Sequence, residues 1–420
     1  MDHRSARARL PLLILVRVHP PPSPPSGAIP VSRFRFRIWR LPVAVLLAVG
    51  CLAGPVSAPA AAGNSGAAGH DDALRERIEE LVRAPGGPPG VIAVLQRRGK
   101  TELYRAGVSE LGTHRRPQPT DHMRIASTAK AFSGAVALQL VDRGRLGLDD
   151  TIGERLPALP EAWHAVTLRQ LLNHTSGLPD YTRDADFLAI LNADPRHHFD
   201  SRRLLDFVAD EPLAFPPGSQ YQYSNSDNIA VALMAEAVTG RRYEELLRRT
   251  VYRPLGLRST SLPQGFLIPE PYLHGYEVDP PNPPEDVSTV LSASGVWASG
   301  GIVSTPRDLT KFIRAYAGGD LISKPTRNQQ RQWRVGASEP AGPGVNATGL
   351  AIFRYTTRCG VVYGHTGNFP GYTQLMAATP DGERSLTFSI TTQVNKDNKP
   401  ELLAELRSVQ EDFICALLRR

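Results

Sequence analysis

The 420-residue sequence has few of the residues that build metal centres. It contains three cysteines and eleven histidines, and they show neither an HExxH motif nor any other spacing typical of metal ligands. His197 and His198 lie together in a polar stretch, which favours a solvated surface over a ligand pair. The chain has no internal repeat, and none of its motifs implies a cofactor. The sequence therefore predicts neither a metal nor a cofactor.

The chain also lacks net charge beyond its N-terminal segment. Its formal net charge is +7, and residues 1–40 account for all of it, with eight arginines against one aspartate. Residues 41–63 carry no charged side chain, so the remaining residues sum to zero. Nucleic-acid binding needs a positive surface that displaces counterions. This balance excludes a nucleic-acid binder.

The first 63 residues are typical of an export signal. Residues 32–40 are cationic, residues 41–52 are apolar, and small residues follow to position 63. This pattern predicts a secretory signal peptide, with cleavage after Ala62 favoured over Ala58. The apolar run is short for a membrane span, which needs roughly 20 residues, so a span is the second interpretation.

Two further features concern the same segment. The Pro-rich residues 1–31 are unlike a leader, and we expect translation to start near Val31. Residues 48–51 resemble a bacterial lipobox with Ala48 at a position where leucine is usual. We therefore expect a secreted, extracellular protein, with lipid anchoring through Cys51 as the alternative.

Cys359 and Cys415 are the cysteines that remain once the leader is set aside. An even number in an oxidising compartment predicts a disulfide between them. Two buried free thiols are the other interpretation, because both cysteines have apolar neighbours in the sequence.

Strand patterns lie at both ends of the chain and helical patterns lie between them. Strands are expected at residues 91–96 and 101–106, joined as a hairpin, and near 349–354, 361–363, 372–378 and 386–392, with a turn at 380–383. Helices are expected at residues 74–82, 128–143, 167–172, 203–209, 228–239, 307–316 and after Pro400. Because the chain exceeds the usual size of one core, one large domain or two medium domains are expected once the leader is removed.

This order of elements predicts an α/β (α+β) fold with an antiparallel sheet flanked by helices and an inserted all-helical domain. We place the leader at residues 1–63, the α/β domain at 64–144 and 286–420, and the helical domain at 145–285.

Ser127-Thr128-Ala129-Lys130 is a candidate catalytic pair at the start of a predicted helix. Positions i and i+3 share one face of a helix, so the lysine amine lies beside the serine hydroxyl and could accept its proton. A helix N-terminus also offers free N–H groups where an oxyanion would form. This motif alone is weak, because it also arises by chance.

Two further motifs follow in order. Tyr223-Ser224-Asn225 is the only Tyr-x-Asn among twelve tyrosines, and His365-Thr366-Gly367 comes next to, or just before, the strand predicted at residues 372–378. A phenol can carry a proton, an amide can hold a substrate amide, and a glycine lets a substrate strand approach a sheet edge.

The order Ser-x-x-Lys, Tyr-Ser-Asn, His-Thr-Gly resembles the penicillin-recognising serine hydrolases. The chain is most similar to secreted actinomycete-type D-alanyl-D-alanine carboxypeptidases and to class C β-lactamases. The resemblance spans about residues 75–418 and extends to residues 171–178, 252–257 and 299–305 and to the cysteine before His-Thr-Gly. It implies a β-lactamase/transpeptidase-like fold with the active site where the helical and α/β domains meet.

The resemblance implies a role for each matching residue. Ser127 would be the acylated nucleophile, Lys130 and Tyr223 would share the proton relay, and Asn225 would contact a substrate amide. His365, Thr366 and Gly367 would form the substrate-binding strand, with His365 and Thr366 facing a substrate carboxylate. The N–H groups of Ser127 and Asn368 would form the oxyanion hole.

Some positions depart from the carboxypeptidase pattern. Those enzymes bind the terminal carboxylate with an arginine on the strand before the cysteine, and here the position falls on Phe353 or Arg354, which point to opposite faces of a strand. Asn368 and Pro370 also replace polar residues after His-Thr-Gly. These departures place strict D-Ala-D-Ala selectivity in doubt.

Three other motif residues have structural interpretations. His174 ends a predicted helix, where its side chain is expected to satisfy local backbone groups. Gly300 and Gly301 are expected to form a tight turn, because no P-loop lysine follows them.

The sequence thus favours a serine D-alanyl-D-alanine carboxypeptidase or other D-stereospecific peptidase that acts through an acyl-enzyme. Its expected ligands are peptidoglycan-type D-alanyl peptides or other acyl substrates, with β-lactams as inhibitors, and a monomer is expected. An esterase or a β-lactamase using the same site is the alternative. A weakly catalytic cell-wall-binding or β-lactam-sensing protein is a third hypothesis.

Overall fold

The structure is a computed structural model that describes residues 65–97 and 99–419. The predicted leader, its cleavage sites and Cys51 lie outside the described residues. Among the helices that are described, none combines the length and the apolar character needed to cross a bilayer.

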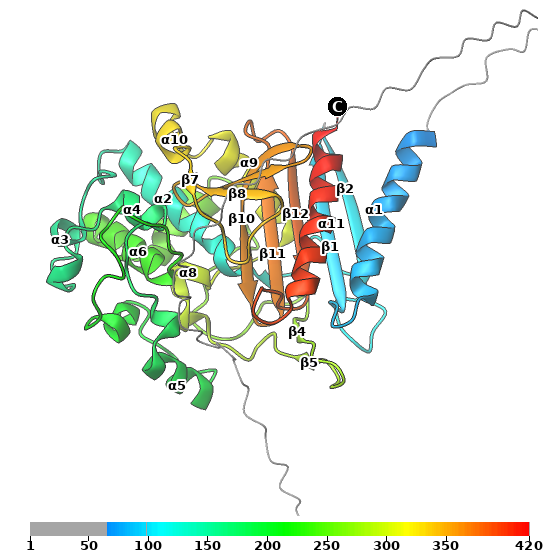
Figure 1. Cartoon of the computed structure of the whole chain (residues 1–420), viewed down its shortest axis with the longest axis horizontal. Helices are drawn as coiled ribbons and strands as arrows, with labels where there is room; N and C mark the ends of the chain where they lie inside the picture. Colours follow the sequence, from blue (N-terminus) through cyan, green and yellow to red (C-terminus); the bar gives the residue numbers. More distant parts are fainter. Residues whose placement is uncertain (1–64, 98, 420) are drawn as a thin grey trace, which may run out of the picture.

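The centre of the molecule is an eight-stranded antiparallel sheet built from both ends of the chain (Figure 1). Its strand order is β2-β1-β12-β11-β10-β9-β8-β7. The strands span β1 (Gly90–Arg97), β2 (Lys100–Gly107), β7 (Arg334–Val335), β8 (Val345–Thr348), β9 (Phe353–Thr357), β10 (Gly360–Phe369), β11 (Tyr372–Ala378) and β12 (Ser385–Ile390). The N-terminal hairpin pairs with β12, which joins the two ends of the chain in one sheet.

Helices cover both faces of this sheet. Along β1, Val91 and Leu95 pack in a core with α1 (Ser65–Arg83) and α11 (Pro400–Leu418), whereas Ile92 and Val94 pack in a second core with α2 (Ala129–Asp142) and α9 (Pro306–Gly318). Successive side chains of a strand point to opposite faces, so an apolar run such as residues 91–95 is buried on both sides. The antiparallel sheet flanked by helices is therefore confirmed.

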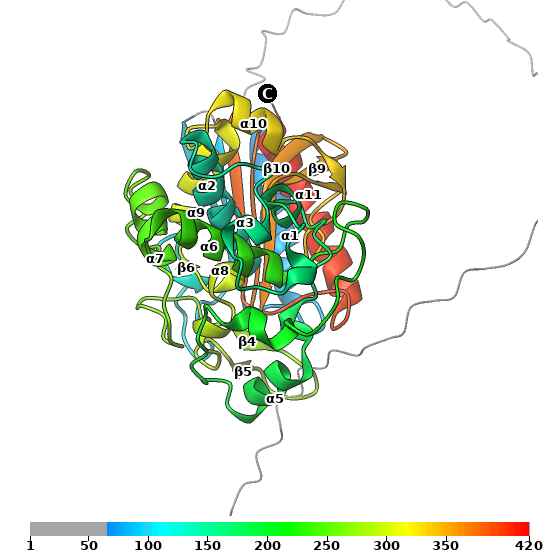
Figure 2. The same cartoon turned by 90° about the vertical axis from the view of Figure 1, so that its left-hand side faces the viewer.

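The remaining helices form a layer beside the sheet, on the left of Figure 1 and toward the viewer in Figure 2. They are α3 (Ile152–Arg155), α4 (Leu168–Leu172), α5 (Ala185–Ala193), α6 (Asn225–Thr239), α7 (Tyr243–Leu247), α8 (Trp297–Gly300) and α10 (Lys324–Gln330). Short strand pairs join β3 (Met123–Arg124) to β6 (Val303–Ser304) and β4 (Tyr276–Glu277) to β5 (Glu285–Asp286). The helix α6 packs against α2, which carries Lys130. The domain boundaries remain a prediction.

Two strand predictions were wrong in their limits. Residues 349–352 form the turn between β8 and β9, where the amide of Gly349 donates to Ile352 O and Ala351 has a left-handed φ of 53°. The His-Thr-Gly motif lies inside β10 and not at the start of β11, because β10 continues to Phe369. Three glycines in this strand, Gly360, Gly364 and Gly367, weaken its sequence signal, since glycine has a low strand propensity.

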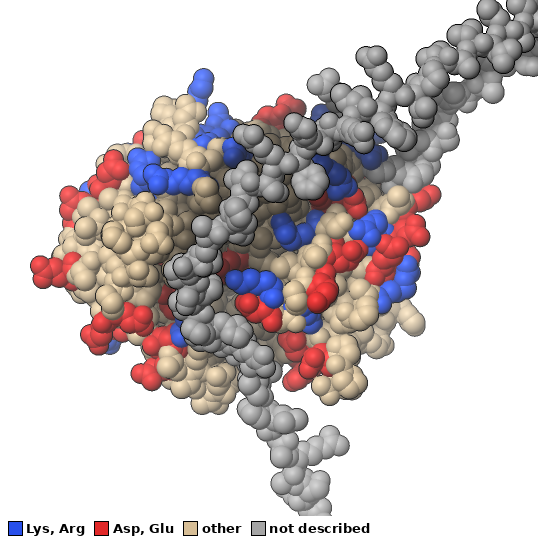
Figure 3. Space-filling view, in the orientation of Figure 1, with Lys and Arg blue, Asp and Glu red and all other residues tan. Residues whose placement is uncertain are grey.

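Charges of both signs are interspersed over the face shown in Figure 3. One cluster of charges joins α1 to α11. Arg77 on α1 pairs with Glu405 and Asp412 on α11 at 2.8 and 3.1 Å. Such half-exposed pairs each contribute little to stability. The larger contribution at this contact comes from the apolar side chains beneath them, including Ile78 and Leu406.

The predicted disulfide is present. Cys359, in the turn between β9 and β10, is bonded to Cys415 on α11. Their Cα–Cα distance is 5.1 Å and their sequence separation is 56. It ties the C-terminal helix to the strand that carries His-Thr-Gly.

Replacing both cysteines with serine is expected to lower the free energy of unfolding by about 4 kcal/mol, because the unfolded chain regains the entropy of a long loop. Denaturant titrations of the oxidised protein and the double variant would measure the difference. The reduced wild type is the control and should match the variant. Equal stability of all three forms would contradict the expectation.

Candidate active site

Ser127 lies at a strained turn that leads into α2. It belongs to a 3-10 turn, Ala126–Thr128, directly before α2. Ala126 has a φ of 50°, in the left-handed region that non-glycine residues rarely adopt. Such strain persists only where the surroundings enforce it, and it is common at active sites. The turn presents the Ser127 hydroxyl to the cleft and leaves its amide in the first helical turn, where N–H groups have no acceptor within the helix.

Lys130 is completely buried beneath Ser127. Its Nζ lies 3.1 Å from Ser127 Oγ, 2.8 Å from Asn225 Oδ1 and 2.8 Å from Ser299 O. A neutral amine has two N–H donors and one lone pair. The two carbonyl oxygens can only accept, so they take both donors, and the lone pair remains for the Ser127 hydroxyl.

The protonation of Lys130 fits this arrangement. Burial lowers the pKa of Lys130 to about 7, against the opposing attraction of Asp180, Glu339 and Asp227. Near neutral pH a substantial fraction is therefore the free amine. A general base works best when its pKa lies near the operating pH.

Tyr223 stands on the other side of Ser127. Its ring lies 4.9 Å from Lys130 Nζ and 4.4 Å from the ring of His174, measured to the Tyr223 centroid. Its buried hydroxyl faces Ser127 but makes no hydrogen bond of good geometry within the described part of the chain. Burial raises the pKa of Tyr223 well above its usual value, and the nearby Ser127 hydroxyl lowers it. Tyr223 therefore holds its proton at neutral pH, whereas Lys130 readily loses one.

A buried His174–Asp227 pair supports Tyr223 from behind. His174 Nδ1 lies 2.7 Å from Asp227 Oδ2, and Ser176 Oγ donates to Asp227 Oδ1. The amide of Ser224 points at His174 Nδ1 at 3.5 Å, and the amide of Gln222 donates to His174 O. The structural interpretation of His174 holds, but its partners are about 50 positions away in sequence instead of local.

Asn225, the first residue of α6, is held at both ends of its amide. Its Oδ1 accepts from Lys130, and its Nδ2 donates to Asp180 Oδ2 at 3.0 Å and to Thr182 Oγ1 at 3.2 Å. These bonds fix the orientation of the amide. Asn225 thus positions Lys130, and Asn225 itself also lines the cleft.

The strand β10 borders the cleft along an open edge. Its residues 360–364 pair with β9, but residues 365–369 pair only with β11. A Cβ on Gly367 would lie 2.4 Å from Ile125 O and 3.1 Å from Ser127 N, so only glycine allows this approach to the nucleophile. Phe369 and Tyr372 are the paired residues on either side of a two-residue turn. In an antiparallel ladder, hydrogen-bonded pairs alternate with pairs that are not hydrogen-bonded. The next pair, Asn368 and Thr373, is therefore not hydrogen-bonded through the backbone, and the N–H of Asn368 points away from β11 to the open edge. Ser127 N and Asn368 N can then face one oxygen.

The structure does not bring the other predicted carboxylate-binding residues to the cleft. His365 is fully buried, its Nδ1 lies 2.6 Å from Thr366 O, and burial lowers its pKa to about 3. Thr366 Oγ1 donates to Pro340 O at 2.6 Å. Arg354 lies over the ring of Trp333, at 5.5 Å, because Phe353 takes the opposite face of β9. Neither His365 nor Arg354 lines the cavity at Ser127.

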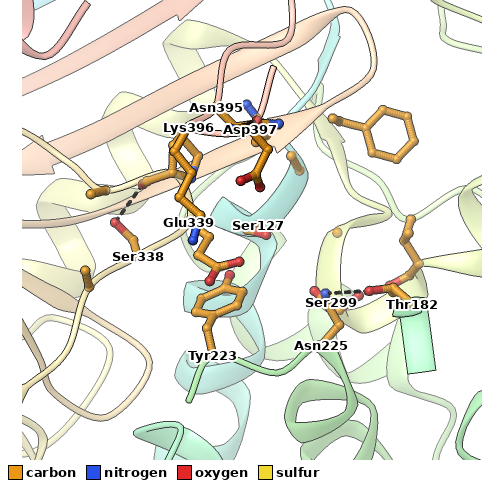
Figure 4. Close-up of a pocket in the computed structure, with 18 of the residues that line it drawn as sticks. Ser127, Thr182, Tyr223, Asn225, Ser299, Ser338, Glu339, Asn395, Lys396 and Asp397 are labelled. Atoms are coloured by element: carbon orange, nitrogen blue, oxygen red, sulfur yellow. Dashed lines mark hydrogen bonds between the residues drawn. The ribbon is translucent and has the colours of Figure 1, made fainter. Parts of the chain in front are cut away.

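The cavity above Ser127 has a volume of about 450 Å³ (Figure 4). Sequence reasoning missed several residues that line it, namely Thr182, Tyr221, Val296, Ser299, Ser338, Glu339, Phe369, Asn395, Lys396 and Asp397. Most lie in loops, which carry no periodic signal. Ser299 is the first residue of a stretch that the family resemblance had marked, residues 299–305, but it was given no role. Thr182 follows another such stretch, residues 171–178. No group of three His, Cys, Asp or Glu side chains within the described residues could hold a metal ion.

Comparison with known proteins agrees with this geometry. The model of the family described as Beta-lactamase matches residues 74–410. The chain belongs to the beta-lactamase family. The resemblance inferred from the motifs is therefore confirmed, and membership in this family together with the Ser127–Lys130–Tyr223 cluster makes the protein a serine hydrolase by fold and site.

Individual members of the family are similar over most of this chain. Penicillin-binding protein 4* of Bacillus subtilis strain 168 is 29% identical over 311 residues, which cover 70% of this chain and 66% of the relative. The chain thus spans just under two thirds of that relative's length. Among solved structures, a D-stereospecific amidohydrolase from Streptomyces sp. is 30% identical with a TM-score of 0.68, covering 77% of this chain and 94% of the other.

A D-amino acid amidase from Ochrobactrum anthropi SV3, complexed with L-phenylalanine amide, is also similar. It is 25% identical with a TM-score of 0.72, covering 83% of this chain and 99% of the amidase. The similarity of fold thus extends to nearly the whole of each solved relative.

The pKa of Lys130 predicts how acylation depends on pH in this family member. The rate of Ser127 acylation by an uncharged nitrophenyl ester should rise about tenfold per pH unit below pH 7 and level off above it, because only the free amine accepts the proton. Stopped-flow kinetics would measure the profile, with Ser127→Ala subtracting the uncatalysed reaction. A rise that continues to pH 10 would contradict a lowered pKa.

The protonation of the His174–Asp227 pair is open to a second test. Burial lowers the pKa of His174 to about 3 and raises that of Asp227 well above its usual range, so we expect a neutral pair in which the Asp227 carboxyl group donates to His174 Nδ1. Asn in place of Asp227 can donate in the same way and should preserve stability within about 1 kcal/mol. Asp227→Ala should cost about 2–4 kcal/mol, because it leaves buried partners unsatisfied.

Thermal and denaturant unfolding of both variants would decide between the states. If Asp227→Asn were as damaging as Asp227→Ala, the pair would be ionic, since removing one charge leaves the other buried and unpaired.

Proposed function

We propose that this protein is a D-stereospecific serine peptidase or amidase that works through an acyl-enzyme on Ser127. One observation carries the catalytic part: the buried Lys130 amine, with a pKa of about 7, has both donors directed to carbonyl oxygens and its lone pair left for Ser127 Oγ. The D-stereospecificity is supported by the similarity to a D-stereospecific amidohydrolase and a D-amino acid amidase.

In the proposed acylation, the Lys130 lone pair takes the hydroxyl proton as Ser127 Oγ bonds to the substrate carbonyl carbon. The carbonyl oxygen becomes an oxyanion between the N–H groups of Ser127 and Asn368, each of which would contribute a few kcal/mol of transition-state stabilisation. When the oxyanion collapses, the C–N bond breaks. The leaving nitrogen takes a proton from Tyr223, and Lys130 returns its proton to the phenol.

In the proposed deacylation, a water molecule attacks the acyl carbon of the Ser127 ester. The Lys130–Tyr223 relay takes the proton from this water and returns it to Ser127 Oγ as the C–O bond breaks. The products are a free acid and the original enzyme, so no external acid, base or redox partner is consumed.

The narrower hypothesis of a D-alanyl-D-alanine carboxypeptidase needs a cation for the terminal carboxylate of the substrate. The residues expected for that task are not at the cavity, because Arg354 lies over Trp333 and His365 is buried and neutral. We therefore propose the broader class of D-aminoacyl peptides and amides. The export expected from residues 32–63 would place the protein where cell-wall peptides occur.

Purified protein should hydrolyse D-alanine and D-phenylalanine amides at least tenfold faster than the L-enantiomers. Ser127→Ala should lose at least about 10³-fold in kcat/KM, because the nucleophile is removed. A fluorescent penicillin should label wild type but not Ser127→Ala, and mass spectrometry should find the label on the peptide containing Ser127. Circular dichroism would establish that the variant is folded.

Equal rates on both enantiomers would contradict the proposed stereospecificity. Full activity of folded Ser127→Ala would contradict the proposed nucleophile.

A further inference from the structure

Glu339 projects into the cavity from a fixed loop between β7 and β8. The loop residues 337–341 line the cavity. The loop is tied at three points, because Thr366 Oγ1 donates to Pro340 O, Tyr221 Oη donates to Ala337 O, and Ser338 Oγ lies 3.1 Å from Tyr355 Oη. Its backbone therefore holds Glu339 in place at the open edge of β10.

The negative charge of the Glu339 carboxylate has no positively charged side chain in direct contact with it among the described residues. Among the described residues, Arg183, Lys396 and Lys130 act on this carboxylate through coulombic attraction, without a hydrogen bond or an ion pair within 4.0 Å. Its side chain is exposed in the cleft, although protein surrounds the position on most sides. Partial burial has the largest effect and raises the pKa of Glu339, and the negative charge of Asp180 adds to this rise. The positive charges of Arg183, Lys396 and Lys130 lower the pKa in part. These cations thus attract the Glu339 carboxylate without forming an ion pair with it.

Figure 4 shows the Glu339 carboxylate beside the Tyr223 ring, to one side of Ser127, with Asn225 and Thr182 on the other side. In the proposed mechanism, Tyr223 gives its proton to the leaving nitrogen. The leaving group must therefore lie on the side of Tyr223 and Glu339, and the acyl group on the side of Asn225, Thr182 and Phe369.

We propose that Glu339 selects substrates by the charge of the leaving group: it disfavours a leaving group with a carboxylate next to the scissile bond and favours an uncharged or cationic one. The inference rests on the proposed function and deepens it. It separates this protein from a carboxypeptidase, whose leaving group is an amino acid with a free carboxylate. Like charges in a partly desolvated cleft repel strongly, because the effective dielectric constant there is well below that of water.

Lys396 is the group that competes with Glu339. It also lines the cavity, next to Asp397, and a substrate carboxylate could approach it. If Lys396 dominates, the preference runs the opposite way, and the two side chains therefore need to be tested in parallel.

The test compares two substrates that share an acyl group, an N-acyl-D-Ala-D-Ala with a free carboxylate and the same peptide with a C-terminal amide. At pH 8, wild type should have a kcat/KM at least tenfold higher for the amide. Glu339→Gln keeps the shape and removes the charge, and should reduce the ratio to within about twofold of unity. Added NaCl should reduce the wild-type ratio through screening.

Two further variants serve as matched comparisons. Lys396→Met should widen the preference for the amide, and Glu383→Gln, which removes an exposed carboxylate in the turn between β11 and β12, away from the cavity, should leave the ratio unchanged. Thermal unfolding midpoints would establish that all variants are folded.

A wild-type ratio near unity, or a ratio that Glu339→Gln does not change, would overturn the inference. A Glu339→Gln variant that slows both substrates equally would overturn it too, because that pattern belongs to a general base. If wild type cleaves neither peptide and no acyl group appears on Ser127, the proposed function fails, and this inference fails with it.

Discussion

The site depends on burying one lysine amine where its charged form is poorly solvated. An isolated ammonium group in a protein interior is costly, and here the neighbours of Lys130 are two carbonyl oxygens and a hydroxyl. This set of partners suits the neutral amine as well as the ammonium, so burial can lower the pKa without leaving an unsatisfied group. The surrounding structure holds these three oxygens at fixed positions around the Lys130 amine.

Each of the three oxygens comes from a different part of the chain. Ser127 lies in the turn before α2, Asn225 begins α6 and Ser299 lies in α8. The Asn225 amide is itself oriented by Asp180 and Thr182, and the neighbouring Tyr223 is supported by the His174–Asp227 pair. A buried polar network of this kind is stable only when its members are satisfied. The catalytic geometry is thus a consequence of helix packing beside the sheet.

The loop at residues 337–341 adds a negatively charged side chain to the site. It lies against the open edge of β10, uses the Thr366 hydroxyl as an anchor and places a carboxylate next to Tyr223. In the proposed function, this loop would set which leaving groups the Ser127 site accepts, through the charge that Glu339 presents. Function in such folds resides in the site and its loops more than in the fold.

The sequence by itself predicted the disulfide pair, the antiparallel sheet with its flanking helices, and the cluster of Ser127, Lys130 and Tyr223 that the structure brings together. These are set by short-range spacing, by apolar periodicity and by ordered motifs, all of which can be read along the chain. Only the tertiary structure decided that Arg354 turns away from the cavity, that His365 and Thr366 are covered, and that Glu339 and Lys396 line it. The direction of a strand side chain changes with a shift of one residue, and loop positions depend on contacts between residues far apart in sequence, so neither can be read from local pattern.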